Sequence, residues 1–138
     1  MPAPVPWIHA FVDLPEPLLK AGLGFWTAVT GWPSGRSWPD HPEFHSIEPP
    51  DGDAYLYLQQ IDGAPRVHLD LVRAAGVAVD DERARHADLG AVAGKRHRWW
   101  QVMSSPGGKA HCLVVERHRA RPGPIMWPDR HRSRVVQV

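Results

Sequence analysis

The sequence is poor in cysteine: Cys112 is the single thiol among 138 residues, so an internal disulfide is excluded. A lone thiol is typical of proteins in a reducing compartment, and we expect a cytoplasmic protein. No apolar run approaches the roughly 18–20 residues of a membrane-spanning helix. The start, Met1-Pro-Ala-Pro-Val-Pro, lacks the basic and apolar regions of a signal peptide. We therefore expect no membrane partner.

Neither sign of charge is in large excess. Sixteen basic and fifteen acidic residues give a net charge of +1, which offers no general reason to expect nucleic acid as a partner. Basic residues do gather at the end, where six arginines and one aspartate lie between residues 117 and 138, a local charge of +5. No aromatic series for base stacking accompanies these arginines. We interpret them as a solvated surface or linker.

The chain is rich in proline, glycine and tryptophan. Fifteen prolines and twelve glycines predict short elements and many turns, and 43% hydrophobic residues predict a core of ordinary size. A length of 138 residues suits one domain. Seven tryptophans are many and favour a binding pocket with aromatic walls.

Residues 66–72, Arg66-Val-His-Leu-Asp-Leu-Val72, alternate strictly between polar and apolar side chains. This period of two predicts a strand with Val67, Leu69 and Leu71 on one face. His68 and Asp70 lie on the other face, which can point either to solvent or into a pocket. If it points into a pocket, these two side chains are the first candidates for chemistry.

The chain reads as two similar halves. Each half has a strand, a helix and then antiparallel strands, and the interval from His9 to Gly31 equals that from His68 to Gly90, 22 residues. Such a repeat indicates a duplicated module. We expect strands near 7–12, 43–48, 54–61, 66–72, 98–103 and 111–116, and helices near 16–30 and 80–89. The links 33–42 and 91–98 read as loops, the first with room for one short edge strand.

Several pieces in this order resemble the vicinal oxygen chelate superfamily, in particular its glyoxalase-like domains. The pieces are Phe11-Val-Asp-Leu-Pro15, Phe25-Trp-Thr-Ala-Val-Thr-Gly-Trp32, Pro50-Asp-Gly-Asp-Ala-Tyr-Leu56, Val67-His-Leu-Asp-Leu71, Asp88-Leu-Gly-Ala91 and Ser105-Pro-Gly-Gly108. The resemblance implies an α+β fold in which two βαβββ modules form a curled mixed sheet around a shared cavity. It also implies a homodimer.

The resemblance sets the domain boundaries. It implies one glyoxalase-like domain over residues 1–118, with modules over about 5–62 and 64–118. Residues 119–138 form a basic Pro/Arg-rich tail, and its end from Trp127 resembles the approach to the first strand of a second such domain. A natural frayed terminus is the alternative, and both interpretations stay open.

In this superfamily the chemistry usually depends on a divalent metal held by two histidines and a glutamate. The resemblance places His68 at one ligand position. In the first strand, counting from Val12 gives Trp7, whereas the internal repeat gives His9. In the last strand Cys112 stands where glutamate is expected, and Glu116 shares its face but lies about 13 Å further along. The candidate ligands for zinc, nickel, manganese or iron are thus His9, His68, Cys112 and Glu116.

The degraded ligand set favours binding over catalysis. We expect a protein that binds a small organic molecule in an aromatic-lined cavity without the usual metal triad, as in bleomycin-resistance-type members. The expected pocket residues are Trp7, His9, Phe11, His68, Asp70, Trp100 and Cys112. The alternative is an enzyme, a metal-dependent lyase, isomerase or dioxygenase, that uses His68 with His9 and an atypical third ligand.

Overall fold

The computed structural model describes residues 5–35, 41–98 and 100–114. Seven strands and two helices follow one another in this part of the chain. The order is β1 (Trp7–Pro15), α1 (Glu16–Thr30), β2 (Phe44–Ile47), β3 (Leu56–Ile61), β4 (Arg66–Val72), α2 (Val79–Asp88), β5 (Val92–Arg96), β6 (Trp100–Ser104) and β7 (Ala110–Val114).

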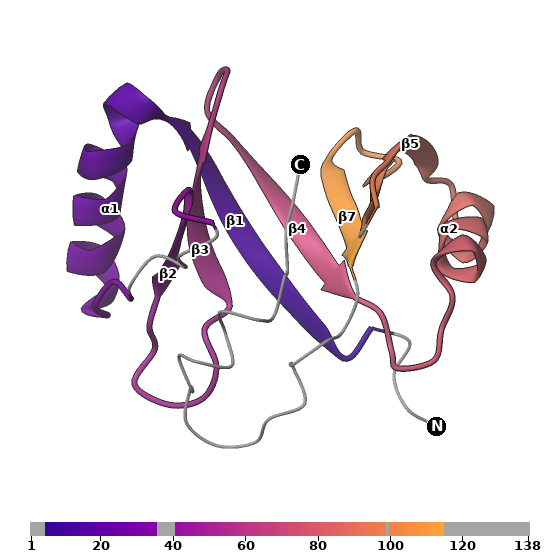
Figure 1. Ribbon diagram of the computed structural model, residues 1–138, viewed down its shortest axis with the longest axis horizontal. Coiled ribbons are helices and arrows are strands. Elements are labelled where there is room, and N and C mark those ends of the chain that lie inside the picture. The colour runs from indigo at the N-terminus through magenta and orange to yellow at the C-terminus, as the bar shows by residue number, and fades with distance from the viewer. Residues whose placement is uncertain (1–4, 36–40, 99, 115–138) are drawn as a thin grey trace.

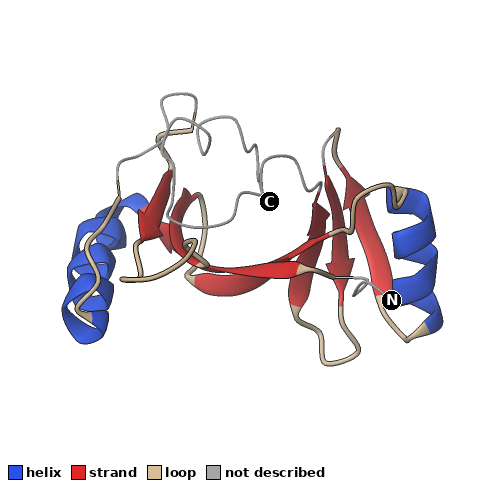
Figure 2. Cartoon of the chain, turned by 90° about the horizontal axis from the view of Figure 1, so that it is seen from below, coloured by secondary structure: helices blue, strands red, loops and turns tan. Residues whose placement is uncertain are grey.

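All seven strands form one mixed sheet in the order β2-β3-β1-β4-β7-β6-β5. The central strands β1 and β4 are antiparallel, and each has a parallel neighbour on its other side, β3 for β1 and β7 for β4. The two halves of the chain therefore meet edge to edge through β1 and β4. The sheet curls, and the helices lie at its two ends on the outer side (Figures 1 and 2).

Local sequence explains where the helices begin and end. Proline is tolerated in the first helical turn, and α1 begins at Glu16 with Pro17 as its second residue. It ends at Gly31, whose φ of 72° requires glycine. The first turn of α2 carries Asp80, Asp81 and Glu82, which interact favourably with the positive end of the helix.

Helix packing identifies the outer face of the sheet. The backbone of α1 at Gly22 lies against Leu14 of β1 and Leu58 of β3. In the other half, His86 of α2 contacts His111 of β7. Because side chains alternate along a strand, His9, Phe11, His68, Asp70 and their neighbours point to the opposite, concave face.

The concave face carries the main apolar cluster. Its buried members are Phe11, Phe44, Ala54, Tyr57, Val72, Cys112 and Val114, with Trp7, Trp100 and Val102 packed against them. On β4 the alternation is clear, since His68 is 2% and Asp70 0% exposed whereas Val67 is 63% and Leu69 43% exposed. The polar face of the strand is thus the buried one.

The expected fold class is confirmed: the protein is α+β, with a mixed, curled and open sheet. One expectation was wrong, because residues 92–96 form strand β5 rather than a loop. In the first half, the only described trace of an equivalent strand is a single bridge between Ser34 and Ile47. Trp99, Glu116 and the tail 119–138 lie outside the described residues, and the division into domains stays a prediction.

No helix among the described residues is long and apolar enough to cross a membrane.

Candidate functional site

Strand register aligns the side chains of the concave face in rows across the sheet. One row joins Tyr57, Phe11 and His68, and the next joins His9, Asp70 and Cys112. Asp13 and Trp100 lie one row further out, at opposite ends of this arrangement. The rows bring together residues from both halves of the chain that are far apart in sequence.

A buried chain of charged groups crosses the junction between the halves. His68 Nδ1 donates a hydrogen bond to Asp13 Oδ2 at 2.6 Å, and His68 Nε2 lies 3.4 Å from Asp70 Oδ1. Burial lowers the pKa of His68, but the two neighbouring carboxylates raise it further, to about 9. At neutral pH the imidazole is therefore protonated.

Arg66 extends this chain toward solvent. Its Nε lies 3.3 Å from Asp13 Oδ2, and its side chain is half exposed. The charges of the four groups alternate in sign along the series and sum to zero. We call this series, Arg66, Asp13, His68 and Asp70, the charge chain. Alternation makes the burial of three ionic groups tolerable, because each charge has an opposite neighbour.

Aromatic rings line the same face beside these charges. The ring of Phe11 stacks on the imidazole of His68 and on the ring of Tyr57, with centroid distances of 4.7 Å and 5.1 Å. His9 contacts Tyr57 edge-on at 5.2 Å, and Trp7 contacts His9 at 6.4 Å. We call these five rings the aromatic row. It belongs mainly to β1, whereas the polar groups belong mainly to β4.

Three residues of the face could hold a metal ion. Ligand atoms of His68, Asp70 and Cys112 all lie within 4.8 Å of one another, and all three residues are buried. Because Asp13 binds Nδ1 of His68, the other ring nitrogen, Nε2, faces Asp70 and Cys112. A carboxylate commonly orients a metal-bound histidine in this way. Nitrogen, oxygen and sulfur donors at this spacing fit zinc.

The set differs from the one that the sequence indicated. His9 stands opposite Asp70 in the register, yet it is not a member of this group. Asp70 takes the third place instead. The ion-binding role of any of these residues remains a prediction.

Sequence reasoning missed Asp13. The run Asp13-Leu-Pro15 looked like the end of the first strand, whereas β1 continues to Pro15 and Asp13 is 0% exposed. A signal was present, because the alternation of His9 and Phe11 places Asp13 on the same face two residues later. Of the expected pocket residues, all seven lie on the concave face.

Some buried polar atoms of this face make no hydrogen bond within the described part of the chain. Asp13 Oδ1, His68 Nε2 and Trp100 Nε1 are among them. Buried polar atoms normally have partners, so such exceptions call for an explanation. A bound molecule with complementary polar groups is one.

Comparison with known proteins identifies a matching family and solved structures with the same fold. The sequence model of a family described as glyoxalase-like domain matches residues 9–114. Curated proteins give no match. Three solved structures share the fold at 13–15% identity, which carries no information beyond the fold.

The first of these structures is an NAD-dependent benzaldehyde dehydrogenase from Legionella pneumophila, with 13% identity and a TM-score of 0.58 over 79% of this chain and 98% of that one. The second is a Mn(II)-bound glyoxalase from Novosphingobium aromaticivorans, with 15% identity and a TM-score of 0.52 over 81% of this chain and 38% of that one. The third is a 2,2',3-trihydroxybiphenyl 1,2-dioxygenase from Sphingomonas wittichii, with 14% identity and a TM-score of 0.52 over 84% of this chain and 41% of that one. The chain spans about two fifths of the last two proteins.

Proposed function

Because the chain belongs to the family of glyoxalase-like domains, we propose that it binds a small organic molecule on the concave face of its sheet. The observation that carries this proposal is the set of buried polar atoms that make no hydrogen bond in the described part of the chain, Asp13 Oδ1, His68 Nε2 and Trp100 Nε1, among aromatic rings. Apolar walls with a few directed polar groups are typical of small-molecule sites.

The polar atoms restrict the chemistry of the molecule. Protonated His68 and the indole of Trp100 are donors, so they select an acceptor oxygen such as a carbonyl or a carboxylate. Asp13 Oδ1 accepts a donor, for example a hydroxyl. The aromatic row favours a planar apolar body. We therefore propose an aromatic or unsaturated oxygen compound as the ligand class.

Binding can be tested with benzoate, phenylpyruvate and, as a control without an acceptor oxygen, toluene. Tryptophan fluorescence and thermal unfolding should report binding of the first two, because a ligand that binds only the native state raises its stability. Trp100→Phe keeps the ring and removes the donor, and it should weaken binding by about 2- to 10-fold, the value of one hydrogen bond.

Trp32→Phe is the matched control, since Trp32 packs edge-on against Tyr55 and is not part of the concave cluster. It should leave the affinity unchanged. Equal affinity for toluene and benzoate, or equal loss in both tryptophan variants, would refute the role of the polar atoms.

A metal-dependent enzyme is the second candidate, and the group His68, Asp70 and Cys112 favours it. A divalent ion there would polarise a carbonyl and stabilise negative charge on oxygen, as lyases, isomerases and dioxygenases require. Asp13 would orient the imidazole, and the nearby rings would exclude water. His68 must be neutral to act as a ligand, so its high proton affinity weakens metal binding near pH 7.

Elemental analysis after loading with zinc, nickel, manganese or iron separates the two candidates. Wild-type protein and a Cys112→Ser variant should be compared at pH 7 and pH 9. Stoichiometric metal in the wild type that is lost in the variant supports the enzyme. Binding of benzoate by metal-free protein supports the first proposal.

A further inference from the structure

A second polar cluster lies on the outer side of the sheet, beneath α2. His86 of α2 and His111 of β7 are 9% and 8% exposed, and the atoms His86 Nδ1 and His111 Nε2 are 3.1 Å apart. Their rings lie 5.2 Å apart with an angle of 32° between them. These side chains take no part in the concave face.

Each imidazole is held from its other side by an acceptor. His86 Nε2 lies 3.2 Å from Glu82 Oε1, which can only accept, and 3.5 Å from Arg85 Nη2, which can only donate. The shorter contact, with the carboxylate, indicates that this nitrogen carries the hydrogen. Burial, and then the charge of His86, lower the pKa of His111, and a hydrogen bond with the backbone of Lys109 offsets part of this effect, as a carbonyl acceptor does. Both outward nitrogens are therefore donors.

The hydrogens on the two outward nitrogens also determine the protonation of the inward nitrogens, His86 Nδ1 and His111 Nε2. A neutral imidazole carries one hydrogen, so in the neutral rings His86 Nδ1 and His111 Nε2 both present lone pairs to each other. Two lone pairs at 3.1 Å repel unless a positive ion lies between them. A single shared proton satisfies this arrangement, and so does a metal ion.

We propose that His86 and His111 bind a divalent transition-metal ion of the zinc and nickel class on the outer face of the sheet. Two imidazole ligands of a tetrahedral zinc ion lie about 3.3 Å apart, since each Zn–N bond is about 2.0–2.1 Å. The present separation of 3.1 Å needs little change. The site is independent of the function proposed for the concave face.

The surroundings of the two histidines match those of metal-bound imidazoles. Such rings normally donate their second N–H to a carboxylate or a backbone carbonyl, which fixes their orientation. Glu82 and the Lys109 carbonyl fill both roles here. Arg85 adds a positive charge, but it is bonded to Glu82, which offsets it.

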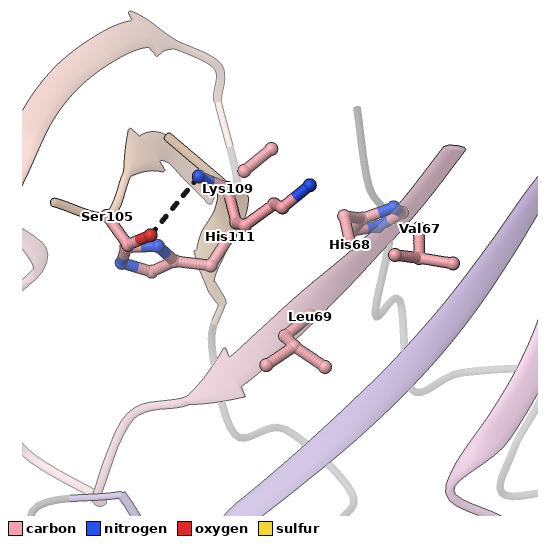
Figure 3. A pocket seen from close by; sticks show the side chains of 7 residues that line it. Val67, His68, Leu69, Ser105, Lys109 and His111 are labelled. Carbon is pink, nitrogen blue, oxygen red and sulfur yellow. Dashed lines mark hydrogen bonds between the residues drawn. The ribbon is translucent and has the colours of Figure 1, made fainter. Parts of the chain in front are cut away.

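Space for further ligands exists on this side of the sheet. His111 lines a pocket of about 340 Å³, together with Ser105 and Lys109 of the β6–β7 turn, Ala110 of β7, and Val67, His68 and Leu69 of β4 (Figure 3). Ser105 Oγ accepts a hydrogen bond from the backbone N–H of Lys109, which holds the turn in place. Solvent in this pocket can complete the coordination of an ion that protein side chains hold at two positions.

Titration calorimetry of the wild-type protein with Zn²⁺ tests the proposal. We expect saturable binding that His86→Gln and His111→Gln each weaken at least 100-fold. Glu82→Gln should weaken it about 10-fold, because outer partners typically contribute 10- to 100-fold. His41→Gln, a matched change in the first half of the chain beside Glu43, should leave it unchanged.

Absorption of Co²⁺-loaded wild-type protein gives a readout that needs no variant to fold. Nitrogen and oxygen ligands give weak visible bands only, as expected for this site. A thiolate-to-metal charge-transfer band would place the ion at Cys112 on the concave face and overturn the proposal. No binding of Zn²⁺ at millimolar concentration, or unchanged affinity in the His86 and His111 variants, would also overturn it.

Discussion

Raising the pH from 6 to 9.5 should remove about 3 kcal/mol of the stability that His68 contributes. Its pKa rises from 6.5 to about 9 on folding, because the carboxylates of Asp13 and Asp70 outweigh the effect of burial. Each tenfold change in proton affinity corresponds to about 1.4 kcal/mol, which gives the 3 kcal/mol. The folded state binds the proton more tightly, so this stabilisation is fully present below pH 6.5 and is lost as the pH rises through 9.

Urea unfolding at several pH values, with a chelator present, measures this effect as the difference between wild type and His68→Gln. The difference cancels contributions of other titrating groups, such as His45 and His111, whose pKa values burial lowers. It should shrink by about 3 kcal/mol between pH 6 and 9.5. In Asp13→Asn, where one carboxylate is gone, the pH dependence should be weaker than in the wild type. A difference that stays constant over this range would refute the charge chain.

Three further substitutions test the packing of the fold, each by urea unfolding at pH 7. Phe11→Ala removes the central ring of the aromatic row, which is 1% exposed, and should cost about 3–5 kcal/mol; less than 1 kcal/mol would mean that the face is not tightly packed. Gly90→Ala forces a side chain onto a residue with φ of 104° and should cost about 1–2 kcal/mol. Gln101→Met keeps the volume but removes the donor that bonds the Gly94 carbonyl at 2.9 Å, and it should cost about 1–3 kcal/mol.

Periodicity predicted the long elements well because their faces differ. Strand β4 spans Arg66–Val72 as expected, and α1 spans Glu16–Thr30 between a proline and a glycine. By contrast, β5 is exposed along its whole length, and Val92-Ala-Gly-Lys-Arg96 has no alternation that could reveal it. A strand with no buried face leaves no trace in the hydrophobic pattern.

The charge chain could be predicted only in part. Alternation identified His68 and Asp70 as one face, but their partner Asp13 is 55 residues away from His68 in sequence. Antiparallel register between β1 and β4 brings them together, and a single sequence does not contain this register. The same holds for His86 and His111, whose contact depends on how α2 packs on the sheet.

The concave face is mainly aromatic on the β1 side and mainly polar on the β4 side. The sequence repeat aligns His9 with His68, but the next residue on the same face is Phe11 in β1 and Asp70 in β4. Across the parallel neighbour, Phe11 pairs with Tyr57, whereas Asp70 pairs with Cys112. The first half thus supplies most of the rings and the second half most of the ionisable groups. Such asymmetry favours a ligand with an apolar end against β1 and β3 and an oxygen-bearing end against β4 and β7.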